Sequence, residues 1–150
     1  MARIFITGST DGLGRAAARM LIEEGHQVVL HARSRDRASA VHDLASRSAG
    51  VVIGDLASAV ETRSIAAQVN AIGRMDSVIH NAPCRRRRVG RRRPRHATIL
   101  AVNALAPYML TALIERPRRL VYLSSSMHRS GTTSLRDIDW LERRWNSSQA

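Results

Sequence analysis

The sequence TGSTDGLG, residues 7–14, joins a short apolar run to an amphipathic one. The apolar run predicts a strand over residues 3–7, and the amphipathic run predicts a helix. A glycine-rich turn between a strand and a helix presents backbone N–H groups at the positive end of the helix dipole. Glycine also lets a diphosphate approach the main chain without a Cβ in the way. In this context we expect the turn to be a dinucleotide-binding site. The expected buried face of the helix consists of Leu13, Ala16, Ala17, Met20 and Leu21.

The remaining chain alternates predicted strands with predicted helices. Parallel strands need crossover connections, which helices usually supply, so this order predicts an α/β fold with a doubly wound, Rossmann-like parallel sheet of about five strands. We expect one domain over residues 1–150. The further strands are expected at residues 27–30, 51–53, 77–80 and 119–123. The further helices are expected around Val41, Leu44 and Ala45, from the capping box at Ser58 and Glu61 to Ile72, and over residues 96–115.

Composition excludes several classes of protein. Aromatic residues make up 3% of the chain, so the core must be aliphatic, which suits a buried parallel sheet. The single cysteine, Cys84, cannot form an internal disulfide, and the six histidines lack metal-ligand spacing, so we expect no metal site. The longest apolar stretch, residues 99–114, is too short to span a membrane as a helix. We expect a cytoplasmic protein without a membrane segment.

The formal charge of +12 is a local feature. All 24 basic residues are arginines, and eight of them lie in residues 85–95. Three interpretations of the Arg-rich loop at residues 83–95 stay open: an arm that binds nucleic acid or phosphate, a solvated loop, and a short segment translated out of frame. The first gives an alternative function, a nucleic-acid-binding module. The tract has no aromatic residue on which a base could stack, which counts against that function.

Several motifs together resemble the short-chain dehydrogenase/reductase family. The spacing of Thr7, Gly8, Gly12 and Gly14, with Leu13 between the last two, resembles its cofactor fingerprint. Two further pairs resemble family motifs after the third and fourth strands: Asp55-Leu56, which would contact the adenine, and Asn81-Ala82, near the ribose. The resemblance implies an oxidoreductase that transfers hydride between a nicotinamide cofactor and a small carbonyl or alcohol substrate. By itself, Asp55 also fits a turn or helix-start residue.

The choice of nicotinamide cofactor follows from charge near the second strand. Family members that prefer NAD usually carry a carboxylate just past this strand, where it repels a 2′-phosphate. Here the chain reads HARSR over residues 31–35, with no carboxylate before Asp36. Arg33 can pair with a phosphate through two parallel N–H bonds, which favours NADP, with NAD as the alternative. A solvated loop arginine is the competing interpretation of Arg33.

Two residues resemble members of the family's catalytic set, Asn103 in the long helix and Ser125 after the fifth strand. A helix kink beside Pro107 and a strand-end hydroxyl are the competing interpretations. The family's proton donor is a tyrosine followed four residues later by a lysine, and this sequence contains no lysine. We therefore expect the N-terminal, cofactor-binding portion of such an enzyme, truncated before this motif and catalytically incomplete unless a partner chain supplies the missing helix.

The end of the chain carries two further expectations. Residues 127–150, which include Trp140 and Trp145, resemble the start of the family's variable substrate loop. The family's later strands and helix would cover the fifth strand, and without them an apolar edge stays open. We therefore expect the isolated chain to be marginally stable or to self-associate, for instance as a homo-oligomer.

Overall fold

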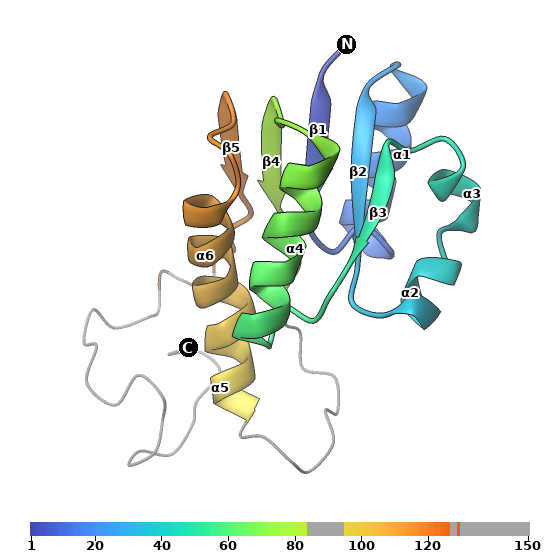
Figure 1. The fold of residues 1–150 in the computed structure, drawn as a ribbon. Coiled ribbons are helices and arrows are strands. Elements are labelled where there is room, and N and C mark those ends of the chain that lie inside the picture. Colours follow the sequence, from blue (N-terminus) through green and yellow to red (C-terminus); the bar gives the residue numbers. More distant parts are fainter. Residues whose placement is uncertain (84–94, 127–128, 130–150) are drawn as a thin grey trace.

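The chain forms a five-stranded parallel sheet in the order β3-β2-β1-β4-β5 (Figure 1). The computed structural model describes residues 1–83, 95–126 and 129. The expected Rossmann-like α/β fold is therefore confirmed. The strands are β1 (Arg3–Ile6), β2 (Gln27–Ala32), β3 (Gly50–Ile53), β4 (Ser77–His80) and β5 (Arg119–Tyr122). In the register, Ile6 pairs with Leu30 of β2 and Ile79 of β4, so β1 lies at the centre of the sheet.

Helices cover both faces of the sheet (Figure 1). Helix α1 (Gly12–Glu23) lies on one face, and α4 (Ala59–Ile72) lies on the other. A second helical segment lies beside α4 and consists of α5 (Arg95–Leu100), a π-helical turn η1 (Ala101–Leu105) and α6 (Ala106–Leu113). Two short helices, α2 (Arg35–Ser39) and α3 (His42–Ala45), follow β2. The helix expected around residues 41–45 corresponds to α3, and the buried Val41 is the residue directly before it.

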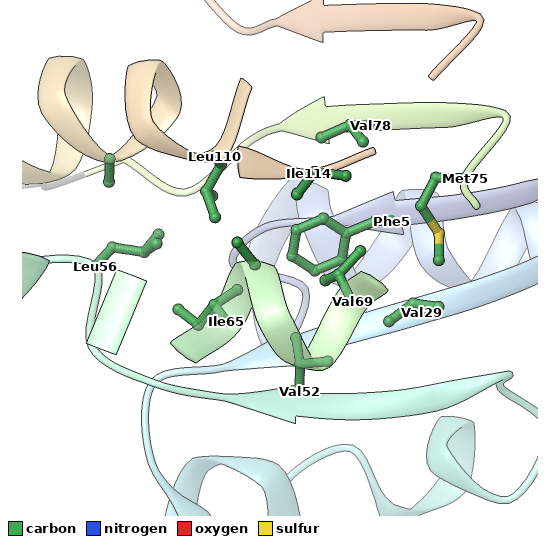
Figure 2. Close-up of a cluster of buried hydrophobic side chains, with 12 residues drawn as sticks. Phe5, Val29, Val52, Leu56, Ile65, Val69, Met75, Val78, Leu110 and Ile114 are labelled. Carbon is green, nitrogen blue, oxygen red and sulfur yellow. The ribbon is translucent and has the colours of Figure 1, made fainter. Parts of the chain in front are cut away.

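Apolar side chains of the strands point alternately to the two faces of the sheet and form one hydrophobic core on each face. Phe5 of β1 points to the α4–α6 face, where it packs with Ile65 and Val69 of α4 and Leu110 of α6 (Figure 2). Ile4 and Ile6 point to the opposite face and pack with Ala18 and Ile22 of α1. Because successive strand residues face opposite sides, both sides of a central strand must be apolar when helices cover both.

The predicted buried face of α1 is confirmed only in part: Ala17 and Leu21 pack against the core, but the centre of the buried face lies about one residue further along the chain. Leu13 is 70% exposed and Met20 is 60% exposed, whereas the buried residues are Gly14, Ala18 and Ile22. These follow the spacing i, i+4, i+8, which also fits a helical face. The small residues Gly14 and Ala18 let the start of α1 approach the sheet closely, and this contact sets the rotation of the helix.

The long helix expected over residues 96–115 is confirmed in outline, with an internal irregularity. It runs from Arg95 to Leu113 and changes to π-helical hydrogen bonding over Ala101–Leu105. Pro107 explains the change, because its ring has no N–H and would clash with the carbonyl of the residue four positions earlier, Asn103, in a regular helix. Helix π-turns of this kind frequently occur at functional sites.

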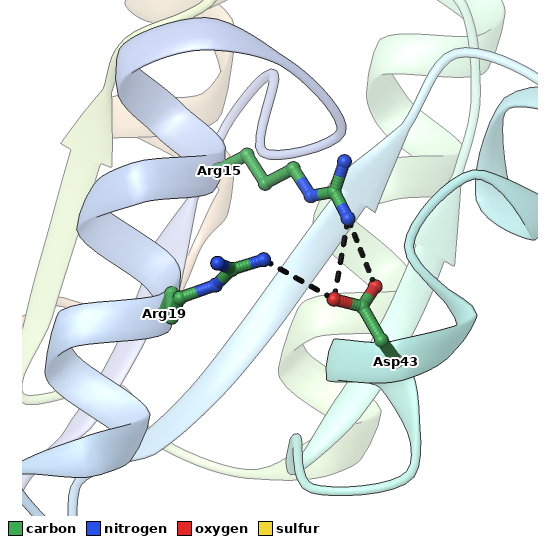
Figure 3. Close-up of polar contacts among 3 residues, drawn as sticks. All are labelled: Arg15, Arg19 and Asp43. Carbon is green, nitrogen blue, oxygen red and sulfur yellow. Dashed lines mark hydrogen bonds and ion pairs between the residues drawn. The ribbon is translucent and has the colours of Figure 1, made fainter.

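An ion-pair cluster joins the first helix to the segment after β2 (Figure 3). Asp43 of α3 accepts hydrogen bonds from Arg15 at 3.1 and 3.2 Å and from Arg19 at 3.3 Å, both of α1. The pairs are exposed, so each contributes little to stability, but they link α3 to α1.

Several sequence expectations fall on residues outside the described ones. They concern residues 84–94 of the Arg-rich loop at residues 83–95, and the tail at residues 127–150 apart from residue 129, with Trp140 and Trp145. Pro83 ends one described range, and Arg95 begins α5. Among the described residues, no helix combines the length and apolar character needed to cross a bilayer. All four residues of β5, at the edge of the sheet, are exposed, and self-association through this edge stays a prediction.

Candidate functional site

The predicted cofactor residues gather at the carboxyl ends of β1 and β4. Thr7 follows β1 and is 2% exposed. Its Oγ1 accepts hydrogen bonds from the backbone N–H groups of Asn81 at 2.9 Å and Ala82 at 3.1 Å, and donates to the Ile79 carbonyl at 3.4 Å. One hydroxyl therefore fastens the end of β4 to the start of the glycine loop, which we define as residues 7–14.

Close backbone approaches explain two of the three glycines. At Gly8, φ is +65°, and a Cβ would lie 2.8 Å from the Cα of Ala82. At Gly14, a Cβ would overlap Nδ2 of Asn81 and lie 2.5 Å from the Gly8 carbonyl oxygen. Gly12 also has a positive φ, +53°, but the space around it is open. The loop is thus a compact cradle that side chains at positions 8 and 14 would disrupt.

The first turn of α1 offers donors to an anion. Asp11 caps the helix and accepts from the Gly12 N–H at 2.8 Å. The N–H groups of Leu13 and Gly14 find no acceptor within the part of the chain that the structure describes. The first N–H groups of a helix lack partners inside the helix, so they are available to an external anion. The cradle of glycines and these donors fit the diphosphate of a dinucleotide.

A histidine that belongs to no sequence motif lies directly beside the cradle. His31 of β2 is 3% exposed, and its Nδ1 accepts a hydrogen bond from the Gly8 N–H at 2.9 Å. Its Nε2 lies 2.9 Å from the Gly54 carbonyl oxygen. Burial lowers the pKa of His31. The only signal in the sequence was a polar residue inside the apolar run that forms β2.

The residues expected at the adenine and 2′-phosphate follow β3 and β2. The Asp55 carboxylate accepts from the Ala57 N–H at 2.9 Å, and its own N–H donates to Glu61 at 2.8 Å. Leu56 is buried in the core cluster with Ile65. Arg33 directly follows β2 and is exposed. Because parallel strands end at the same edge of the sheet, Arg33, Asp55 and the glycine loop share that edge.

The two predicted catalytic residues lie on the β4–β5 side of the same edge. Asn103 is exposed in the π-helical turn η1, and Ser125 is exposed three residues after β5. Their catalytic roles stay predictions. The described residues contain no group of three or more His, Cys, Asp or Glu side chains suited to a metal ion.

Comparison with known proteins identifies what the fold and the cradle resemble. The family model for short chain dehydrogenases matches residues 2–119. The short-chain dehydrogenase chyC of Penicillium rubens is 47% identical over 148 residues, which cover 95% of this chain and 55% of that protein. The short-chain dehydrogenase chry4 of Gibberella zeae gives the same identity and the same shares. This chain thus spans about half the length of these curated relatives.

Solved structures repeat the same architecture. A blue fluorescent protein from a metagenomic library, in complex with NADPH, superposes with a TM-score of 0.73 at 19% identity, over 85% of this chain and 57% of that chain. At this identity the likeness concerns the fold alone. A gluconate 5-dehydrogenase from Burkholderia cenocepacia, in complex with NADP and tartrate, gives a TM-score of 0.61 at 25% identity, over 75% of this chain and 47% of that chain.

Proposed function

Because the chain belongs to the short-chain dehydrogenase family, we propose that it binds a nicotinamide dinucleotide and forms the cofactor-binding portion of an oxidoreductase. We propose a small carbonyl or alcohol compound as the substrate. The enzyme would transfer a hydride between this compound and the cofactor. Asn103 and Ser125 are the residues that we propose contact this substrate.

The glycine cradle is the observation that carries this proposal. Gly8 and Gly14 leave no room for a Cβ, so the loop brings backbone rather than side chains to the surface above α1. The N–H groups of Leu13 and Gly14 are then available to an anion at the positive end of the helix dipole. A diphosphate, flanked by an adenosine toward β2 and β3 and a nicotinamide toward β4 and β5, matches this arrangement.

We further propose NADP as the preferred cofactor. Arg33 is exposed directly after β2, at a position where a carboxylate would repel a 2′-phosphate. The gluconate 5-dehydrogenase at 25% identity was crystallised with NADP, which agrees with this choice. NAD remains the alternative that the binding experiment below tests directly.

Calorimetric titration of the 150-residue chain with NADPH, NADH and single-stranded DNA, at two salt concentrations, tests the proposed function. We expect saturable NADPH binding, weaker NADH binding and no site-specific DNA response. Replacing both Gly12 and Gly14 by Val should abolish NADPH binding. No NADPH response together with DNA binding that falls steeply with salt would instead support the nucleic-acid alternative. The family match gives that alternative no support.

A further inference from the structure

The His31 ring joins two loops that are far apart in sequence. Its Nδ1 accepts from the Gly8 N–H, and its Nε2 lies within hydrogen-bonding distance of the Gly54 carbonyl, both at 2.9 Å. Since a carbonyl can only accept, Nε2 must carry the hydrogen, and Nδ1 must be unprotonated. The neutral ring in this one tautomer therefore satisfies both partners.

The main chain of His31 holds the same loop. Its N–H donates to Oγ of Ser9 at 2.8 Å, and its carbonyl accepts from the Ser9 N–H at 3.3 Å. Ser9 is fully buried. Ring and main chain together thus hold residues 8 and 9 against β2, while the ring alone reaches Gly54, the residue before Asp55.

A protonated ring would not fit these partners. With hydrogens on both nitrogens, Nδ1 would point its N–H at the N–H of Gly8, donor against donor, so the glycine loop would have to move. Burial lowers the pKa of His31, although the hydrogen bond to Gly54 and the negative charge of Asp55 act in the opposite direction. On the β1 side, the uncharged Phe5 ring packs edge-on at a centroid distance of 6.5 Å.

Resting on the proposed function, we propose that neutral His31 is a positioning residue for cofactor binding. It holds the glycine loop and the turn at Gly54 and Asp55 in the arrangement that receives the diphosphate and the adenosine. Protonation of its ring disrupts this arrangement and weakens binding of the dinucleotide. His31 itself does not contact the reacting atoms.

Titration of NADP⁺ into the 150-residue chain between pH 8 and pH 4.5 tests this role. The parent chain is compared with His31→Phe, which removes both ring nitrogens, and with His31→Gln, whose amide can accept and donate but does not titrate. His42→Gln, an exposed histidine on α3, is the matched control. The 2′-phosphate of NADP⁺ titrates at about pH 6 in every sample, so only differences between variants report on His31. Circular dichroism at each pH confirms that the chains are folded.

We expect the parent and His42→Gln to lose affinity at acidic pH, by up to about tenfold per pH unit below the pKa of His31. His31→Phe should bind at least tenfold more weakly at pH 8 and lose this additional pH dependence. His31→Gln should recover most of the parent's NADP⁺ affinity at pH 8 but should lack the additional loss of affinity at acidic pH. If His31→Phe does not fold, the comparison of His31→Gln with the parent tests the role of His31. If the parent binds and either variant keeps the parent's pH profile, the role of His31 is wrong while the proposed function stands. A folded parent that binds no NADP⁺ at pH 8 overturns both.

Discussion

The Asn81 side chain fills the space that any side chain at position 14 would need. Its Nδ2 donates to the carbonyls of Thr7 at 3.0 Å and Gly8 at 3.2 Å, and a Cβ built on Gly14 would overlap that nitrogen. The end of β4, the glycine loop and the first turn of α1 are therefore held in mutual contact. This geometry explains why the third residue of α1 is a glycine, since it lies where the helix meets Asn81 and the Gly8 carbonyl.

Replacing Gly14 by Ala should weaken NADPH binding at least tenfold. The new Cβ must displace both Asn81 and the Gly8 carbonyl, and the second of these is backbone. Overpacking of this kind typically costs about 1–3 kcal/mol of stability. Calorimetry and thermal unfolding measure the two effects.

Gly25→Ala is the control for this change. Gly25 has a φ of +82°, so alanine is strained there, but open space surrounds it at the far end of α1. We expect a stability loss of about 1 kcal/mol with unchanged NADPH affinity. Equal affinities for the Gly14→Ala variant and the parent would show that the cradle does not bind the cofactor.

Thr7→Val should destabilise the chain by about 2–4 kcal/mol. Valine has the same shape, but it leaves the N–H groups of Asn81 and Ala82 without their shared acceptor. Chemical denaturation measures the loss.

Thr62→Val is the matched comparison for Thr7→Val, since Thr62 is equally buried, at 1% exposure. Its hydroxyl donates to the Ser58 carbonyl, which also accepts from the Thr62 backbone N–H. No backbone group loses its only partner, so we expect a change below about 1 kcal/mol. Similar losses for the two variants would contradict the role assigned to the Thr7 hydroxyl.

Local sequence patterns were sufficient to predict most of the fold. Short apolar runs, such as VVIG at residues 51–54, indicate strands that are buried between two layers of helices. Glycines after amphipathic runs indicate where helices end. These signals are local, so the sequence pattern alone is enough to identify the elements. The rotation of α1 is predicted only in part, because two adjacent faces of the helix both satisfy helical spacing and share Ala17 and Leu21 at their border. Contact between Gly14 and Asn81, 67 positions apart in the sequence, selects between these faces. A short stretch of sequence around α1 does not contain this long-range contact, so its pattern cannot predict the rotation of the helix.

The site was predicted in its composition but not in its internal contacts. The glycines and Asn81 were selected through resemblance, and they do lie together. However, the Asn81 amide is hydrogen-bonded to the glycine loop, and its expected place near the ribose stays a prediction. His31 was overlooked because a single histidine in a strand carries no motif. Its importance depends on Gly8 and Gly54, which lie 23 positions to either side.

Stability should fall as the pH drops from about 6.5 toward about 4. Burial lowers the pKa of His80 from 6.5 to about 4, so between these values the unfolded chain binds more protons than the folded one. The stabilisation is therefore complete above pH 6.5 and is lost on acidification. Denaturant unfolding at several pH values should show this slope, to which His31 also contributes.

His80→Phe separates the contribution of His80 from that of other groups. Phenylalanine can keep the stacking with Tyr122, whose ring lies 4.7 Å away, and it does not titrate. It gives up the contact of Nε2 with the Thr111 hydroxyl at 3.3 Å and removes the buried Nδ1, which has no hydrogen-bond partner among the described residues. The variant should show a shallower pH dependence over this range, and an unchanged slope would rule out His80 as a source.

Arg33→Ala should reduce NADPH affinity about tenfold or more while leaving NADH affinity within about twofold. Hydrogen bonds to charged groups contribute roughly 1.5–3 kcal/mol, and only NADPH carries the 2′-phosphate that Arg33 would bind. Arg35→Ala, an exposed arginine two residues away, controls for the loss of general positive charge. Calorimetry with both cofactors gives the ratio of affinities for each variant. Because a diffuse charge effect would weaken NADPH binding equally in the two variants, a specific loss in Arg33→Ala alone identifies the residue that selects the cofactor. Parallel losses of NADPH and NADH affinity would instead assign Arg33 to the shared part of the dinucleotide.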